Sequence, residues 1–197
     1  MHALVVSALC LHQLFTGAFS DAASAADGVP AVLRTTPVSW VVVGLTLGYY
    51  SADILMVLTQ KALFSAMIAV HHAMALASMA TAIDIRAAHA YVLFGLFTEV
   101  TTPFVNLRWR LHEAGQAHRR IYVANGLAMT AVWGAARVVA FGPLFRHVYV
   151  HFGDSVAYLP TYALLVMLGV PALLFVLNVV WFQKMVAGAA KICLLYT

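Results

Sequence analysis

Long apolar stretches alternate with short polar breaks along this chain. Each stretch is about 20 residues long, and at about 1.5 Å per residue a helix of that length crosses the hydrocarbon core of a bilayer. The pattern predicts an all-α fold, a polytopic transmembrane helix bundle of at least six helices. The predicted helices cover residues 2–20, 38–59, 62–83, 87–107, 121–142 and 157–182.

The polar breaks predict which helices are neighbours. The breaks at 60–61 and 84–86 are very short, so the second, third and fourth helices must follow one another as antiparallel neighbours. The chain has room for a single integral domain, 1–197. The first stretch has a second interpretation, because residues 3–14 followed by small residues are also typical of a signal peptide. We favour a helix, since only His2 precedes the stretch as a basic residue.

Composition excludes several classes of protein. Of 197 residues, 63% are hydrophobic and 9% are charged, against about 25% charged in an ordinary soluble domain. The net charge of +4 lies in the breaks, and no basic helix or aromatic platform indicates a nucleic-acid partner. Cys10 and Cys193 are isolated and support neither a disulfide framework nor a zinc site.

The positive charges predict an orientation. Seven Lys and Arg residues fall on one side of the predicted bundle and three on the other, which by the positive-inside rule places the loop after the fourth helix and the C-terminus in the cytosol. The cytosolic set is Lys61, Arg108, Arg110, Arg119, Arg120, Lys184 and Lys191, and the opposite set is Arg34, Arg86 and Arg146.

Polar side chains inside the predicted helices fall in one layer. Counted from the cytosolic helix ends, the depths are roughly 9 Å for Asp53, 14–15 Å for His71 and His72, 12 Å for Glu99, and 6 Å for Asn125 and Asn178. Arg137, at roughly 24 Å, is expected near the opposite face and outside this layer.

The adjacent pair His71 and His72 is the strongest candidate site, because ionisable groups are costly within a bilayer and mark functional positions there. Adjacent helical residues point about 100° apart, so one ring can face a cavity while the other contacts a neighbouring helix. Asp53 is the nearest candidate partner in depth. Asp53 and a histidine of the pair form either a structural hydrogen bond between two helices or a catalytic acid–base pair, and the sequence favours neither hypothesis.

We expect no metal and no cofactor. A di-iron lipid hydroxylase or desaturase would need several histidine boxes that supply about eight ligands, whereas residues 67 and 68 beside the histidine pair are Met and Ile. Binding of a haem by both histidines is a further hypothesis, which no other feature of the sequence supports.

The fourth helix carries the sequence LFTEVTTPFVNLRW at 96–109. Pro103 cannot donate to the Glu99 carbonyl and clashes with it, so a kink is predicted at Glu99. The hydroxyls of three neighbouring threonines add a polar notch. Arg108 and Trp109 mark the cytosolic interface, either as an anchor or as a contact for a lipid headgroup.

Four ordered motifs resemble the TLC family, whose name refers to homology with TRAM, LAG1 and CLN8, and most closely its branch of TLC domain-containing protein 4. They are the HH pair at 71–72, TEVTTPFVNLRW at 98–109, NGLAMTAVWGAARV at 125–138 and LNVVWFQKMVAGAAK at 177–191. The resemblance covers essentially the whole chain. It implies a multi-pass membrane protein, typically of the endoplasmic reticulum, in a family linked to sphingolipid and phospholipid homeostasis. It also implies a further helix before residue 2.

Ceramide synthases of the wider family transfer an acyl group from acyl-CoA, and the resemblance gives His71 and His72 a candidate catalytic role, with Asp53 or Glu99 orienting a ring. The further His-Asp and second Asp of those enzymes are missing here. We therefore expect a non-enzymatic lipid sensor, carrier or regulator that binds a lipid or acyl chain in an intramembrane polar pocket, with an acyl-CoA-dependent acyltransferase as the alternative. The pocket is expected to be lined by Asp53, His71, His72 and Glu99. The expected partner is a membrane lipid or acyl-CoA. The candidate lipid-binding residues are Glu99, Asn125, Asn178, Arg108 and Trp109.

Overall fold

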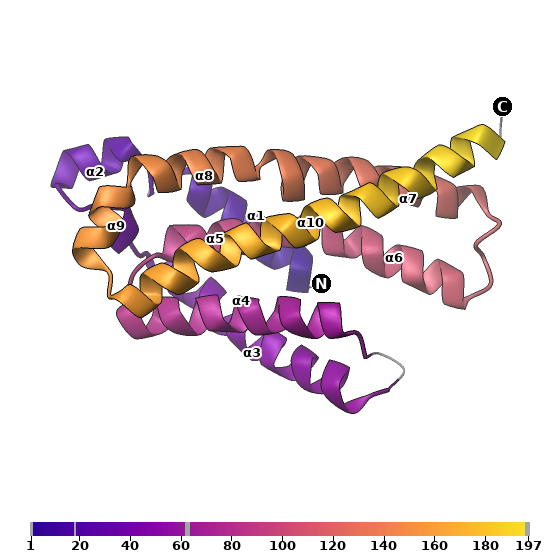
Figure 1. Ribbon diagram of the computed structural model, residues 1–197, viewed down its shortest axis with the longest axis horizontal. Helices are drawn as coiled ribbons and strands as arrows, with labels where there is room; N and C mark the ends of the chain where they lie inside the picture. The colour runs from indigo at the N-terminus through magenta and orange to yellow at the C-terminus, as the bar shows by residue number, and fades with distance from the viewer. Residues whose placement is uncertain (1, 18, 62–63, 196–197) are drawn as a thin grey trace.

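The chain forms a bundle of helices in a computed structural model that describes residues 2–17, 19–61 and 64–195 (Figure 1). The α-helices are α1 (His2–Phe15), α2 (Asp21–Asp27), α3 (Pro37–Thr59), α4 (Ala66–Ile85), α5 (His89–Phe97), α6 (Thr102–Glu113), α7 (Arg120–Gly134), α8 (Phe141–Val150), α9 (Phe152–Tyr158) and α10 (Thr161–Leu195). Shorter turns are the 3₁₀ helices η1 (Ala31–Leu33) and η2 (Thr98–Thr101) and the π-helix η3 (Ala135–Val139). The described residues contain no strand, and the all-α class is confirmed.

Among the described residues, five helical segments are long and apolar enough to cross a membrane: Pro37–Thr59, Ala66–Ile85, His89–Glu113, Arg120–Val150 and Thr161–Lys191. The first predicted helix is a shorter apolar helix, His2–Phe15. The segment His89–Glu113, the fourth predicted helix, runs six residues past its predicted end at 107, and Arg120–Val150, the fifth predicted helix, runs eight residues past 142. Residues 62–63 of the third predicted helix lie outside the described residues.

Local signals fix where individual helices begin and end. At the start of α3 the Thr36 hydroxyl accepts from the Ser39 amide at 2.9 Å, the Ser39 hydroxyl accepts from the Thr36 amide at 2.9 Å, and Pro37 follows the cap. The turn from α4 to α5 is tight, because Arg86 and Ala88 both have positive φ, 51° and 61°. Packing of α3 on α4 and of α4 on α5 agrees with the short predicted breaks.

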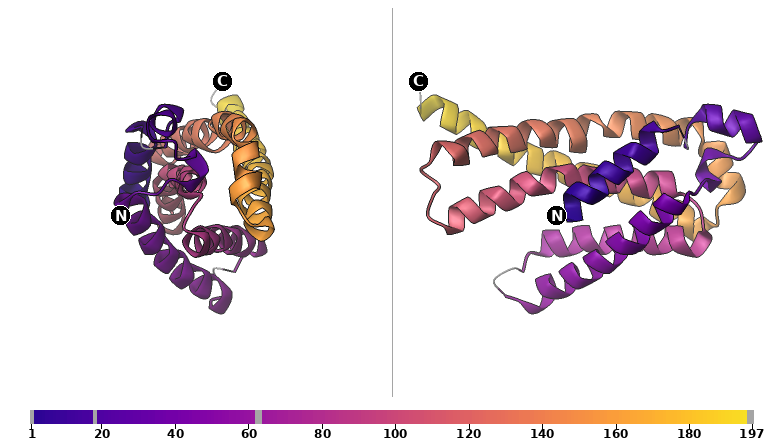
Figure 2. Two further views of the ribbon diagram at one scale, coloured as in Figure 1. Left: turned by 90° about the vertical axis from the view of Figure 1, so that its left-hand side faces the viewer. Right: turned by 180° about the vertical axis from the view of Figure 1, so that it is seen from behind.

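The core surrounds α5, which lies inside the ring of longer helices in the end-on view of Figure 2. Nearly every residue of this helix up to Leu96 is buried, and the His89 ring lies 2.8 Å (Nδ1 to Oγ) from Ser39 of α3. The outer helices expose large apolar side chains, among them Leu45, Val139 and Leu165. Such a surface suits hydrocarbon and not water.

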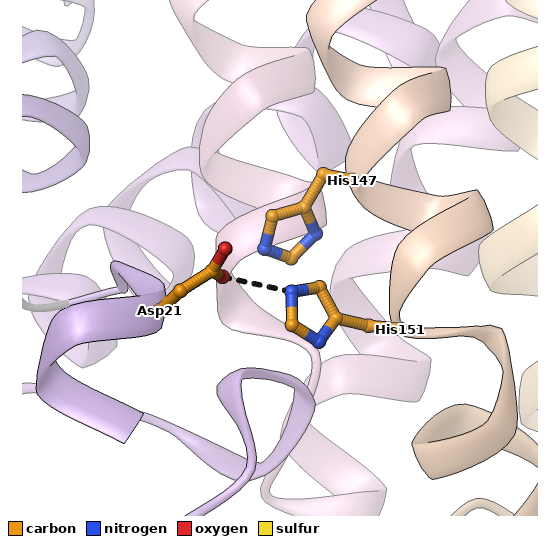
Figure 3. A group of neighbouring side chains, drawn as sticks. All are labelled: Asp21, His147 and His151. Carbon is orange, nitrogen blue, oxygen red and sulfur yellow. Dashed lines mark hydrogen bonds and ion pairs between the residues drawn. The ribbon is translucent and has the colours of Figure 1, made fainter. Parts of the chain in front are cut away.

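The segment containing α2 is fastened at the end of the bundle away from the C-terminus (Figure 1). Arg34 donates to the Ala23 carbonyl at 2.6 Å and pairs with Asp27. The Val29 amide, helped by Arg34, holds the pKa of the Asp27 carboxyl below its usual value. Asp21, the first residue of α2, reaches His151 next to α8 (Figure 3).

Candidate functional site

The two histidines of α4 point to different surroundings. The His72 ring lies on the α3 side, where its Nδ1 is 3.3 Å from Asp53 Oδ2 and its ring meets Tyr50 edge-on at 4.9 Å between centroids. The His71 ring points inward and meets Trp181 of α10 edge-on at 5.9 Å. The structure therefore brings Asp53 beside one of the histidines, His72.

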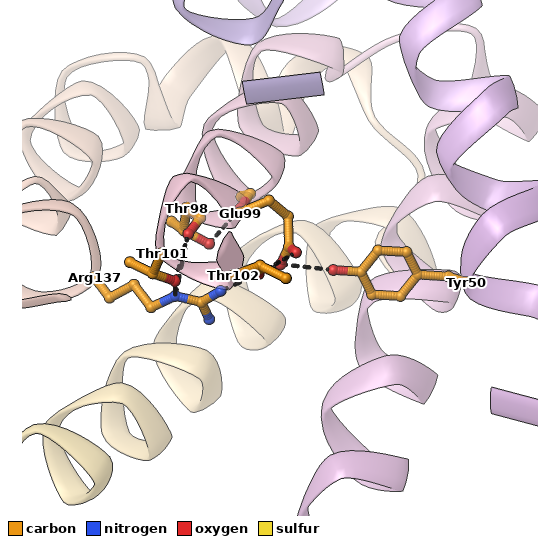
Figure 4. Close-up of polar contacts among 7 residues, drawn as sticks. Tyr50, Thr98, Glu99, Thr101, Thr102 and Arg137 are labelled. Atoms are coloured by element: carbon orange, nitrogen blue, oxygen red, sulfur yellow. Dashed lines mark hydrogen bonds and ion pairs between the residues drawn. The ribbon is translucent and has the colours of Figure 1, made fainter. Parts of the chain in front are cut away.

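Glu99 is the centre of a buried polar network (Figure 4). Its Oε1 accepts a hydrogen bond from the Tyr50 hydroxyl at 2.8 Å and an ion-paired hydrogen bond from Arg137 Nη2 at 3.2 Å, while its Oε2 accepts from the Thr102 hydroxyl at 2.7 Å. Both carboxylate oxygens are thus occupied by groups from three different helical segments. A carboxylate held in this way fixes the packing of those segments.

Arg137 lies in the centre of this network, so the prediction that it lies outside the polar layer of Glu99 is wrong. Its Nε donates to the Thr101 hydroxyl at 2.8 Å and to the Thr98 carbonyl at 3.2 Å, and its guanidinium lies 4.5 Å from the centroid of the Trp133 ring. The error came from the end of the fourth helix. Since that helix continues to Glu113, Glu99 lies about 21 Å from the end of its helix. Arg137 lies about 25 Å from Arg120, the matching end of its own helix, so the two depths are similar.

At Glu99, where a kink is predicted, the helix changes type. The 3₁₀ turn Thr98–Thr101 interrupts the α-helix two residues before Pro103, and the Thr98 hydroxyl donates a hydrogen bond to the Gly95 carbonyl at 2.7 Å. On the facing helix, Arg137 sits in the π-helical turn Ala135–Val139. The 3₁₀ turn and the π-helical turn therefore face each other at the ion pair. In proteins, π-helical turns inside α-helices often occur at functional sites.

A small inner cavity adjoins the network. Its volume is about 50 Å³, and apolar side chains of α4, α5, α8 and α10 make up most of its lining. The polar side chains that line it are Tyr50, His71, Ser78, Tyr91, Thr98, Glu99, Arg137 and Asn178. Such a volume holds a few water-sized molecules and not a lipid. The buried Nδ1 of His71 and Oδ1 of Asn178 have no hydrogen-bond partner among the described residues. The cavity is therefore lined by two polar groups without a hydrogen-bond partner in the part of the chain that the structure describes, on His71 and Asn178, and by the Glu99–Arg137 ion pair.

The two asparagines of the predicted layer lie in different places. Asn125 is buried, and its amide donates to the Phe104 carbonyl at 2.9 Å, a bond that joins α7 to α6. Asn178 lines the inner cavity, and its backbone carbonyl accepts from the Trp133 indole at 3.1 Å. Of the two, only Asn178 presents its side chain to the cavity.

Arg108 and Trp109 line a larger opening, here called the outer groove, between α4, α6, α7 and α10. Its volume is about 570 Å³. Arg108 lies 4.1 Å over the Tyr122 ring, and its buried Nη1 has no hydrogen-bond partner among the described residues. The remaining lining is mainly apolar, and includes Met67, Ile68, Val105, Met129, Trp133 and Trp181, with Lys184 as a second cation.

Trp181 connects the two spaces. It lines the outer groove, meets the His71 ring of the inner cavity, and packs edge-on against Trp133 at 5.7 Å. Tyr50 and Trp181 were not among the candidate residues of the sequence. A tyrosine three residues before Asp53, on the same helical face, was the available signal for Tyr50; no sequence signal placed Trp181 beside His71.

Comparison with known proteins now decides the family. The family model for the TLC domain matches residues 1–187 of the chain. The chain belongs to the TLC domain family. With its five apolar helical segments, this TLC-domain chain is an integral membrane protein.

Curated relatives agree with this assignment. TLC domain-containing protein 4-B of Danio rerio is 26% identical over 202 residues, which cover 98% of this chain and 71% of the relative. TLC domain-containing protein 4-A of Xenopus laevis is 29% identical over 200 residues, covering 97% and 72%. Protein CLN8 of Rattus norvegicus is 28% identical over 125 residues, covering 61% and 42%. No solved structure matches the chain.

Proposed function

We propose that this TLC-domain protein acts in membrane lipid homeostasis, in the endoplasmic reticulum, by binding the acyl chain of a lipid in the outer groove. The observation that carries the proposal is the groove itself, about 570 Å³ of mainly apolar lining with cations at its rim. Small-molecule pockets typically measure about 300–1,000 Å³ and combine apolar walls with a few polar groups. The inner cavity, at about 50 Å³, is too small for this task.

The cations suit an anionic head. Arg108 is held over Tyr122 with its Nη1 unpaired among the described residues, and Lys184 lies on the facing helix. A phosphate or carboxylate in the groove would pair with the Arg108 guanidinium, because charge-assisted hydrogen bonds to guanidinium are strong. A phospholipid, a fatty acid and acyl-CoA all carry such a head beside an acyl chain.

The test is photocrosslinking in nanodiscs with a phospholipid that carries a diazirine on its acyl chain. We expect label on peptides that contain Ile68 or Trp181, and several-fold less label in Arg108→Gln. Arg110→Gln is the matched control, because Arg110 is exposed two residues along the same helix and does not line the groove. Equal labelling of both variants, or label spread evenly over all helices, would contradict the proposal.

An acyl-CoA-dependent acyltransferase is the second candidate, favoured by the unpaired Nδ1 of His71 beside Trp181. A neutral imidazole there can accept an acyl group from the thioester or deprotonate an acceptor. Intact-mass measurement after incubation with a long-chain acyl-CoA should then show an adduct or turnover that His71→Ala and His72→Ala remove. Lipid capture with neither adduct nor turnover would support the carrier instead.

A further inference from the structure

Three ligand-type side chains converge at the end of the bundle away from the outer groove. They are Asp21 at the start of α2, His147 in the last turn of α8, and His151 at the junction of α8 and α9 (Figure 3). None of them belongs to the site described above. Asp21 and His151 are separated by 130 positions in the chain, so the cluster exists only in the folded protein.

The geometry is that of potential ligands to one ion. Each residue offers one ligand atom, and the three atoms lie within 4.8 Å of one another. Asp21 Oδ1 is 2.8 Å from His151 Nε2, and the two imidazole centroids are 4.4 Å apart. Ligands of a tetrahedral zinc ion lie about 3.3 Å apart, given bonds of about 2.0–2.2 Å. Small side-chain rotations are therefore enough to reach that arrangement.

The backbone holds the histidines in place. Two histidines four residues apart on a helix are a known way of binding one zinc ion from a single face. The His151 amide donates to the His147 carbonyl at 3.0 Å, and the His151 carbonyl accepts from both the amide and the hydroxyl of Ser155, each at 3.0 Å. The junction between α8 and α9 thus continues the helical hydrogen bonding through both ligands.

Surrounding groups supply orientation and charge. Asp154 Oδ2 lies 3.7 Å from His151 Nδ1, the ring nitrogen that does not face Asp21. Carboxylates in this position orient metal-bound histidines. Asp21 is carried by a segment that Ser20 caps and Arg34 fastens. Arg146 also lines the hollow beside the cluster, and the two carboxylates offset its charge.

We propose that Asp21, His147 and His151 bind a divalent transition-metal ion of the zinc type, with at least one coordination position open to the hollow. Two imidazoles and one carboxylate suit zinc or a neighbouring first-row ion, whereas calcium and magnesium prefer a full set of oxygen ligands. The bound ion would tie α2 to α8. The expectation from the sequence that no metal is bound considered the pair at 71–72 and not this spacing at 147 and 151.

The experiment uses the full chain, purified in detergent without a histidine tag and stripped with a chelator. Co²⁺ is titrated first, because its visible absorption reports coordination geometry, and Zn²⁺ is then used as the competitor. We expect one equivalent with a tetrahedral or five-coordinate spectrum, and at least tenfold weaker binding in His147→Ala and His151→Ala. His112→Ala is the matched control, since His112 is an exposed histidine on α6.

Asp21→Asn separates a loss of metal binding from misfolding. Asp21 is exposed, so replacing it leaves the core intact. It should weaken binding while the circular dichroism spectrum stays that of the wild type. Zn²⁺ should also raise the unfolding temperature of the wild type and of His112→Ala, and not that of the ligand variants. Zinc affinity equal in the wild type and in all three ligand variants would overturn the proposal, as would wild-type protein that binds no zinc.

Discussion

At the residue scale, burial decides what each ionisable group does. Glu99 and Arg137 are both buried, and each satisfies the other together with Tyr50, Thr101 and Thr102. Removing one partner of a buried pair leaves an uncompensated charge, which costs more than losing the attraction between the two. The Asp53–His72 pair is more exposed and therefore less constrained.

Glu99→Gln and Arg137→Leu should each lower the free energy of unfolding by about 3–5 kcal/mol, because each leaves its partner buried without an opposite charge. The double variant Glu99→Leu with Arg137→Leu should lose much less than the sum of the matching single variants Glu99→Leu and Arg137→Leu. Reversible unfolding in mixed micelles would measure the difference. Strictly additive losses would argue against an energetic coupling between the two residues.

At the element scale, helix ends decide depth and register. Arg108 and Trp109, taken to mark the interface, suggested a helix end at 107. In the structure α6 continues to Glu113, because Arg and His side chains in its last turn favour the negative end of a helix dipole. The end of α4, in contrast, agrees with the short predicted break. Arg86 ends this helix in the left-handed conformation that glycine usually adopts. The turn at Arg86 places α5 directly back against α4.

Arg86→Gly should therefore stabilise the protein by about 0.5–1 kcal/mol, since a residue without Cβ adopts φ 51° with less strain. Arg86→Ala is the control, because it removes the same charge and keeps the Cβ. Thermal unfolding in detergent should show a gain for the glycine variant only. A gain of the same size in both variants would mean that the side chain, and not the backbone conformation, causes the effect.

At the scale of the whole molecule, α7 and α10 approach closely. This places Trp133 and Trp181 of the outer groove next to His71 of the inner cavity. The two helices approach at Gly134, where an added Cβ would lie 2.9 Å from the Phe182 ring. Small residues allow such contacts between membrane helices, where dispersion contacts contribute much of the association energy. The contact holds Trp133 and Trp181 at the boundary between outer groove and inner cavity.

Gly134→Ala should lower the free energy of unfolding by about 1–3 kcal/mol through overpacking against Phe182. Gly48→Ala has no neighbouring atom within 4 Å of its new Cβ and, in the interior of α3, should gain about 0.5–1 kcal/mol. In a Phe182→Leu background the penalty of Gly134→Ala should shrink, because the ring that it meets is gone. Unfolding measurements on the four combinations test this, and an unchanged penalty in that background would show that another contact is responsible.

The lengths of the apolar stretches and of the breaks between them determined the class of fold and the neighbours of α4. The sequence also indicated that His71 and His72 diverge and that Pro103 disturbs the helix at Glu99. These features depend on residues near one another in the chain, for which the rise and turn of a helix are sufficient information.

Contacts between distant segments were decided by the tertiary structure alone. The pairing of Glu99 with Arg137, the seat of Trp181 beside His71, and the meeting of Asp21 with His147 and His151 all depend on how far each helix extends and how it is rotated about its axis. A six-residue error in one helix end shifts depth by about 9 Å, which was enough to separate Arg137 from its partner in the prediction. Rotation and register are set by side-chain packing across the whole bundle, and no single stretch of sequence contains that information.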